Sequence, residues 1–115
     1  MTIRDIVTIL DAQVVCGENL DIEVHNACGS DMMSDVLAFV KEQSVLLSGL
    51  VNTQVVRTAE MMDMLCIVFV RGKTPNEEMI ALAKERGIVL LTTPIRMFTA
   101  CGLLYQNGLT GGDAV

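Results

Sequence analysis

Hydrophobic and polar positions alternate in blocks along residues 44–104, and the blocks have the lengths of strands and helices. Three apolar runs, at residues 45–47, 66–70 and 88–91, each lead into a polar turn, and segments with helical spacing separate them. The first run belongs to a strand predicted at residues 45–50. Strands that alternate with helices in this way favour a parallel sheet. Ligands of such sheets bind beyond the carboxyl ends of the strands, where these turns would lie. The pattern therefore predicts an α/β fold and one edge of the sheet at which to look for a site.

The chain before residue 44 adds further elements of both kinds. Thr2 can cap a helix whose apolar positions run over residues 3–10. Short strands are expected at residues 12–15 and 22–25, the second because apolar and polar residues alternate there. The whole chain is thus expected to form a small, mainly parallel sheet of about five strands flanked by helices.

Polar residues in front of the remaining helical segments indicate where each helix begins. The expected caps are Ser30 or Asp31, Asn52 or Thr53, Thr74 followed by Pro75, and Thr93 followed by Pro94. Gly87 is expected to end the helix before it in a left-handed conformation. These punctuating residues predict helices after each of the last four strands.

The length of 115 residues indicates one domain, expected over residues 1–109, with residues 110–115 as a disordered tail. Apolar residues make up 51% of the chain, which is more than the interior of so small a domain can hold. Excess apolar residues reach the surface, and exposed apolar patches mark contacts with partners. We therefore expect a homodimer.

The charge of the chain restricts its partners and location. A net charge of −6 argues against binding of nucleic acid, which needs a basic surface. No apolar run reaches the ~18 residues of a membrane span, and the N-terminus lacks the features of a signal peptide. The sequence predicts a cytoplasmic protein that uses neither membrane nor nucleic acid.

Cations and hydroxyl groups collect near the predicted strand ends and helix starts. These residues are Asn52, Thr53, Arg57, Thr58, Arg71, Lys73, Thr92, Thr93 and Arg96. Helix N-termini present free N–H groups to phosphate or carboxylate, and arginine adds bidentate contacts. The alternative is that the polar residues are helix caps and the arginines are solvated. Both interpretations stay open from sequence alone.

Other chemistry has less support. His25 and Cys28 are close in sequence, but the four cysteines are scattered and form no pair with metal-site spacing, so they are expected to be buried small hydrophobes. Asp31 and Asp35 are one helical turn apart, and we expect one at a helix N-terminus and the other in solvent. No phosphate-binding or dinucleotide-binding glycine loop is present. We predict no catalytic residue, no metal and no cofactor.

Several strings resemble the DRTGG domain family in order and spacing, and together they cover nearly the whole chain. The strings lie at residues 19–24, 29–35, 70–72 and 87–94. The resemblance implies a DRTGG-like fold. It also implies a regulatory or subunit-association role, since such domains are attached to phosphotransacetylases, to pyrophosphatases with CBS domains and to relatives of HPr kinase. Stand-alone members are associated with anaerobic redox systems.

The pattern and the resemblance together favour a non-catalytic regulatory or dimerisation module. Its ligand would be a small anion or a nucleotide-type molecule, or it would act on a partner protein. The alternative function is a small accessory enzyme, or a protein associated with redox chemistry or phosphotransfer in anaerobic metabolism.

Overall fold

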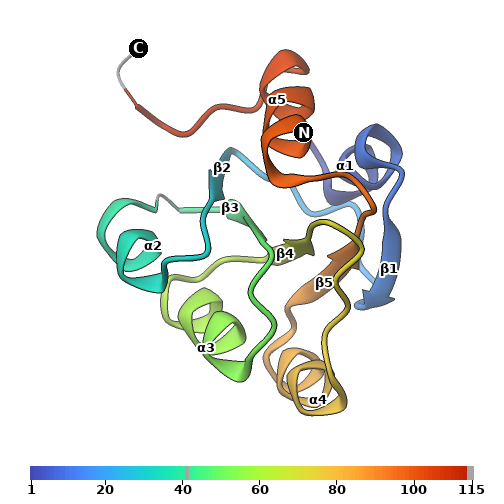
Figure 1. Ribbon diagram of the computed structural model, residues 1–115, viewed down its shortest axis with the longest axis vertical. Coiled ribbons are helices and arrows are strands. Elements are labelled where there is room, and N and C mark those ends of the chain that lie inside the picture. Colours follow the sequence, from blue (N-terminus) through green and yellow to red (C-terminus); the bar gives the residue numbers. More distant parts are fainter. Residues whose placement is uncertain (41, 114–115) are drawn as a thin grey trace.

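The computed structural model describes residues 1–40 and 42–113, which build a five-stranded sheet between two layers of helices (Figure 1). The strand order is β1-β5-β4-β3-β2. The strands are β1 (Gln13–Cys16), β2 (Asn26–Gly29), β3 (Ser44–Ser48), β4 (Cys66–Phe69) and β5 (Val89–Thr92). All neighbouring pairs are parallel except β1 and β5. The predicted α/β fold with a small, mainly parallel sheet is confirmed.

The helices divide between the two faces of the sheet (Figure 1). One face carries α1 (Ile3–Leu10) and α5 (Met97–Gln106), which pack against each other. The other face carries α2 (Met33–Phe39), α3 (Thr53–Met61) and α4 (Glu77–Arg86). Parallel strands joined by crossover helices need cover on both faces, and this arrangement supplies it.

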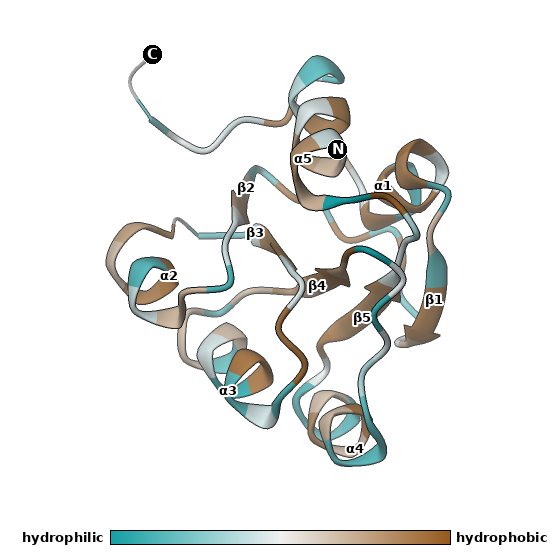
Figure 2. Cartoon of the chain, in the orientation of Figure 1, coloured by the Kyte–Doolittle hydropathy of each residue, from teal (hydrophilic) through white to brown (hydrophobic). Residues whose placement is uncertain are grey.

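The central strands are hydrophobic on both faces, and this is why they appear in the sequence as continuous apolar runs (Figure 2). Val45, Leu47 and Val68 point toward α1 and α5. Ile67 and Phe69 point toward the layer formed by α2, α3 and α4. The two resulting clusters are the core of the protein, and the sheet separates them.

The predicted strand at residues 22–25 is wrong. Its backbone bonds to the chain around the start of α1: the Ile3 amide donates to Ile22 O at 3.1 Å, and the Val24 amide donates to Met1 O at 2.7 Å. Val24 is buried against that helix. The alternation of apolar and polar residues therefore records packing on α1, and the strand of the sheet, β2, begins one residue after this stretch, at Asn26.

The residues predicted to cap α2 and α4 do not cap these helices. Helix α2 begins at Met33 without a side-chain cap, because the Ser30 hydroxyl accepts from the nearby Met32 amide and Asp31 bonds to another strand end. Helix α4 begins at Glu77, where Asn76 rather than Thr74 accepts the capping bond.

The last helix also begins later than predicted. It starts at Met97, and Thr93 is buried four residues earlier. The Thr93 hydroxyl donates to Leu10 O at 2.6 Å and accepts from the Ile95 amide, so it joins α1 to the loop after β5.

The remaining predicted helix ends are confirmed. Thr2 forms a capping box with Asp5, Asn52 caps α3, and Gly87 ends α4 at a φ of 72°. Beyond α5, the Ala27 amide donates to Thr110 O at 2.9 Å, so the first residue of the predicted tail is bonded to β2. Residues 114 and 115 of that tail lie outside the described residues. None of the helices in residues 1–40 and 42–113 is long and apolar enough to cross a membrane.

Candidate functional site

The loops that follow β3, β4 and β5 meet at the carboxyl edge of the sheet and are bonded to one another. The Val70 amide donates to Ser48 O at 3.1 Å, and the Arg71 amide donates to Ile95 O at 2.9 Å. The Gly72 amide donates to Thr93 O, also at 2.9 Å. These bonds hold the β4–α4 loop between its two neighbours, so side chains from different loops share one surface.

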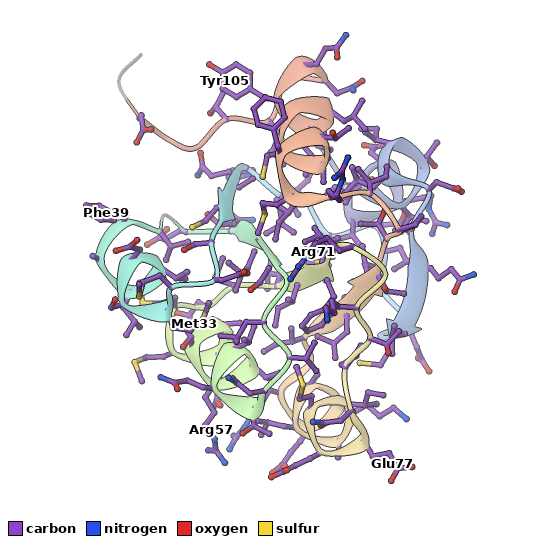
Figure 3. The ribbon with its side chains drawn as sticks, in the orientation of Figure 1. Met33, Phe39, Arg57, Arg71, Glu77 and Tyr105 are labelled. Atoms are coloured by element: carbon purple, nitrogen blue, oxygen red, sulfur yellow. The ribbon has the colours of Figure 1, made fainter. Side chains whose placement is uncertain are left out.

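Arg71 holds a left-handed backbone conformation, with a φ of 60°. This conformation costs about 1–2 kcal/mol for a residue with a side chain, and such residues cluster at functional sites. The Arg71 side chain lies beside the end of β3 (Figure 3). Its guanidinium lies next to Gly49, the residue after that strand. A Cβ on Gly49 would be 2.6 Å from Nη2 of Arg71, so only glycine leaves room for the side chain in this position.

Asp31 fixes the chain beneath Arg71. Its Oδ1 accepts from the Ser48 hydroxyl at 3.0 Å and from the Gly49 amide at 2.7 Å. The carboxylate thus ties the end of β2 to the end of β3 and holds Gly49 in place. The sequence prediction missed this role. The only signal available was that Gly49 ends a predictable strand, because β2, which precedes Asp31, was not predicted at its true position.

The cations at this edge have no carboxylate partner. Within the described part of the chain, Arg71, Lys73 and Arg96 make no ion pair, whereas Arg4 and Arg86 bond to Asp21 and Glu60, each at 3.1 Å. All three unpaired side chains are exposed. In a protein with an excess of acids, this leaves positive charge available on one side of the sheet.

A hollow of about 390 Å³ lies at the same edge, between β1 and the β4–α4 loop. It is lined by Asp11, Ala12, Gln13, Gly72, Thr74, Thr92 and Pro94. The Thr92 hydroxyl donates to Lys73 O at 2.6 Å, which fixes the loop beside the hollow. Thr92 and the loop that carries Arg71 and Lys73 therefore adjoin the same space.

The structure separates the other predicted site residues from this edge or uses them to hold the fold. Asn52 accepts from the Val55 amide as the cap of α3, Thr53 is in the first turn of that helix, and Thr58 is buried on its inner face. Arg57 points away from Arg71 (Figure 3). The Thr93 hydroxyl is buried and bonded to Leu10 O of α1 and to the Ile95 amide. Four of the nine candidates stay at the carboxyl edge without a capping or burial role: Arg71 and Lys73 in the loop after β4, Thr92 at the end of β5, and Arg96 just before α5.

The cysteine thiols are poorly suited to redox or nucleophilic chemistry. Burial raises the pKa of all four thiols, and Cys66 is fully buried in the sheet. A raised pKa lowers the fraction of thiolate, which is the reactive form. No group of three potential metal ligands exists among residues 1–40 and 42–113, and His25 is exposed before β2.

We expect the native thiols to react slowly with iodoacetamide at mildly alkaline pH, and Cys66 to react the slowest, because burial disfavours its thiolate and blocks access. Mass spectrometry of the labelled chain measures each rate. The same chain unfolded in urea is the control, and there all four thiols should react at similar rates. A native thiol that reacts faster than its unfolded counterpart would support the redox hypothesis instead.

A family model described as "DRTGG domain" matches residues 5–106. The chain belongs to the DRTGG domain family. The match covers the four strings on which the resemblance was based, and the predicted family is confirmed. No curated protein sequence matches the chain significantly.

A solved structure shares the fold of this DRTGG domain. It is the crystal structure of the CBS and DRTGG domains of the regulatory region of Clostridium perfringens pyrophosphatase, complexed with the activator diadenosine tetraphosphate. The TM-score is 0.78 and the sequence identity is 22%, with 99% of this chain covered. The chain spans about half of that structure, 52% of its length. A DRTGG domain of the same fold thus forms part of a regulatory region in that protein.

Proposed function

We propose that this DRTGG domain is a non-catalytic regulatory module that binds a small anion of the nucleotide type at the carboxyl edge of its sheet and acts as a homodimer. The observation that carries the proposal is the position of Arg71. Its strained backbone and the bare Gly49 beneath it place an unpaired guanidinium at the edge where parallel sheets bind ligands. The DRTGG domain of the clostridial pyrophosphatase, which has the same fold, belongs to a regulatory region, and this supports the same conclusion.

The electrostatics of the neighbouring helix ends favour an anion beside Arg71 and Arg96. Helix α5 begins at this edge with no side-chain cap and no acid in its first turn, so its free N–H groups and positive dipole end are available. Helix α4 differs, because Asn76 caps it and Glu77 and Glu78 occupy its first turn. An anion at this edge is therefore attracted toward α5 and the arginines and repelled from α4.

The side chains that could perform acid–base or redox chemistry are engaged in hydrogen bonds or are buried, and this supports a role without catalysis. The Asp31 carboxylate, one of the two acids spaced one helical turn apart in the sequence, accepts hydrogen bonds from Ser48 and Gly49. The thiols have raised pKa values, as described above. Phosphate recognition by arginine needs only binding and orientation, and these are the properties that this edge supplies.

The proposal is tested by urea unfolding with diadenosine tetraphosphate, ATP or inorganic phosphate present. We expect the Gly49→Ala variant to bind the best of these probes at least tenfold more weakly than the wild type. The new Cβ would lie 2.6 Å from Nη2 of Arg71, so the guanidinium would have to move away to reach an ordinary contact distance. A shift of about 1 Å is enough to weaken a contact that depends on precise positioning. The fold should survive, because the φ of Gly49 is not left-handed and only the end of a flexible side chain has to move.

Ala81→Ser is the control, since Ala81 is exposed in the middle of α4, away from both the carboxyl edge and α5. This variant should bind like the wild type. A wild-type chain that none of the three probes stabilises would contradict the ligand part of the proposal. Equal binding by the Gly49→Ala variant would show that the anion lies elsewhere.

A further inference from the structure

Helix α5 has an apolar surface that its own chain covers on one side only. Its ten residues include no charged side chain. Ala100 and Leu104 are buried against the sheet, whereas Phe98 is 90% exposed and Tyr105 is 60% exposed. Large apolar side chains that are exposed together mark a contact with a partner. Phe98 is also the most exposed of the large hydrophobic residues in the described part of the chain.

Three of the exposed residues of α5 form a stripe with a gap in the middle, and the exposed polar residues Thr99 and Gln106 lie beside it. Phe98, Gly102 and Tyr105 are four and three residues apart, so they lie on one face of the helix. A Cβ on Gly102 would have no atom within 4 Å, which leaves an open notch between the two aromatic rings. Tyr105 projects from α5 away from the sheet (Figure 3).

A hollow of about 130 Å³ adjoins the same face, between α5 and the edge strand β2. Its lining consists of Ala27, Gly29, Cys101, Leu104, Tyr105, Leu109, Thr110 and Gly111. None of these residues is charged. The face thus offers both a projecting aromatic ring, Phe98, and a small uncharged hollow beside Tyr105.

We infer that this face, defined by Phe98, Gly102, Tyr105 and the adjoining hollow, is the surface through which two copies of the chain associate. An antiparallel pair of α5 helices that cross at Gly102 brings Phe98 of each copy to the Tyr105 end of the other. The projecting ring and the hollow then meet twice, as a two-fold interface requires. An aromatic anchor seated in a desolvated hollow is the usual source of binding energy at such interfaces.

A projecting ring and a hollow on the same face favour a second copy as the occupant, and the charges of the chain permit it. Each copy has a net charge of −6, so like copies repel one another except where a surface is uncharged, and neither α5 nor the hollow has a charged residue. A helix that lies on a membrane surface uses Lys and Arg on its polar face, and α5 has neither. The inference rests on the homodimer of the proposed function and assigns its surface.

Light scattering after size exclusion at micromolar concentration tests the assignment. The wild type should have twice the mass of the 12.5 kDa chain. Phe98→Asp places two carboxylates in the interface, and Gly102→Leu fills the notch. Both variants should weaken the dimer at least 100-fold and run as monomers with unchanged circular dichroism, because both sites are exposed. Phe39→Asp, at a 72% exposed site on α2, is the control and should stay dimeric.

The outcomes separate the assigned surface from the proposed function. A wild-type dimer that persists in both α5 variants would overturn the surface and leave the homodimer standing. A monomeric wild type would overturn both, while the ligand part is still measured independently by the Gly49→Ala titration. A monomeric wild type that floats with anionic vesicles, and loses them in Phe98→Asp, would assign the face to lipid instead.

Discussion

Replacing Arg71 with glutamine is expected to abolish the stabilisation of this domain by its anionic ligand. At a ligand concentration of about 100 times the dissociation constant, binding adds about 2.7 kcal/mol to the free energy of unfolding, and the variant should lose all of it. Arg71 is the cation that the fold holds in place, through its backbone bond to Ile95 and its contact with Gly49. Glutamine removes the charge and the bidentate fork but keeps the left-handed backbone strain.

The matched control is Arg57→Gln, because Arg57 is also exposed and without an ion pair in the described residues but points away from the edge. It should retain the full effect of the ligand in urea unfolding. Arg71→Gly adds a second check: it also removes the guanidinium, but it relieves the left-handed strain, so the unliganded domain should be no less stable than the wild type. Ligand stabilisation that persists in Arg71→Gln would exclude this side chain from the site.

The sheet could be predicted because its central strands are buried on both faces. A strand such as Cys66–Phe69 must be apolar at every position, and a continuous apolar run between turns is readable without tertiary information. The edge strand β2 could not be predicted in the same way. Its residues are small or polar and only partly buried, and the alternating stretch just before it packs on α1 instead.

The candidate site was predictable only in part, since its central contact depends on strand register. Arg71 follows a predictable strand, and that position identifies it as a candidate. The bond between Asp31 and Gly49 arises because β2 and β3 run parallel with Gly29 opposite Leu47, so residues two positions further along each chain come together. The sequence shows that Gly49 follows a strand, but not that Asp31 follows one, nor that the two strands are neighbours. The left-handed backbone of Arg71 is equally invisible in sequence, because arginine is an unusual residue for that conformation.

Gly17, the residue after β1, has no room for a side chain. Gly17→Ala is therefore expected to lower the free energy of unfolding by about 3 kcal/mol. Gly17 has a φ of 108°, where a side chain costs about 1–3 kcal/mol. Its Cβ would also lie 2.7 Å from Cγ2 and 3.0 Å from Cα of Val89. A rotation of the valine side chain cannot relieve the second contact, so β5 itself would have to move, which adds about 1–3 kcal/mol.

Gly108→Ala separates the two costs, since Gly108 has nearly the same φ, 103°, but a Cβ added there would have no atom within 4 Å. Both variants carry the backbone strain, so the difference between their urea midpoints, at equal slope, measures the contact with Val89 alone. If both variants lose the same free energy of unfolding, β5 moves away from the new Cβ without loss of stability. A larger loss for Gly17→Ala would mean that the packing of β1 against β5 is rigid. This rigidity would then help to hold the carboxyl edge in shape, because Thr92 at the end of β5 and the loop after it bond to the loop that carries Arg71.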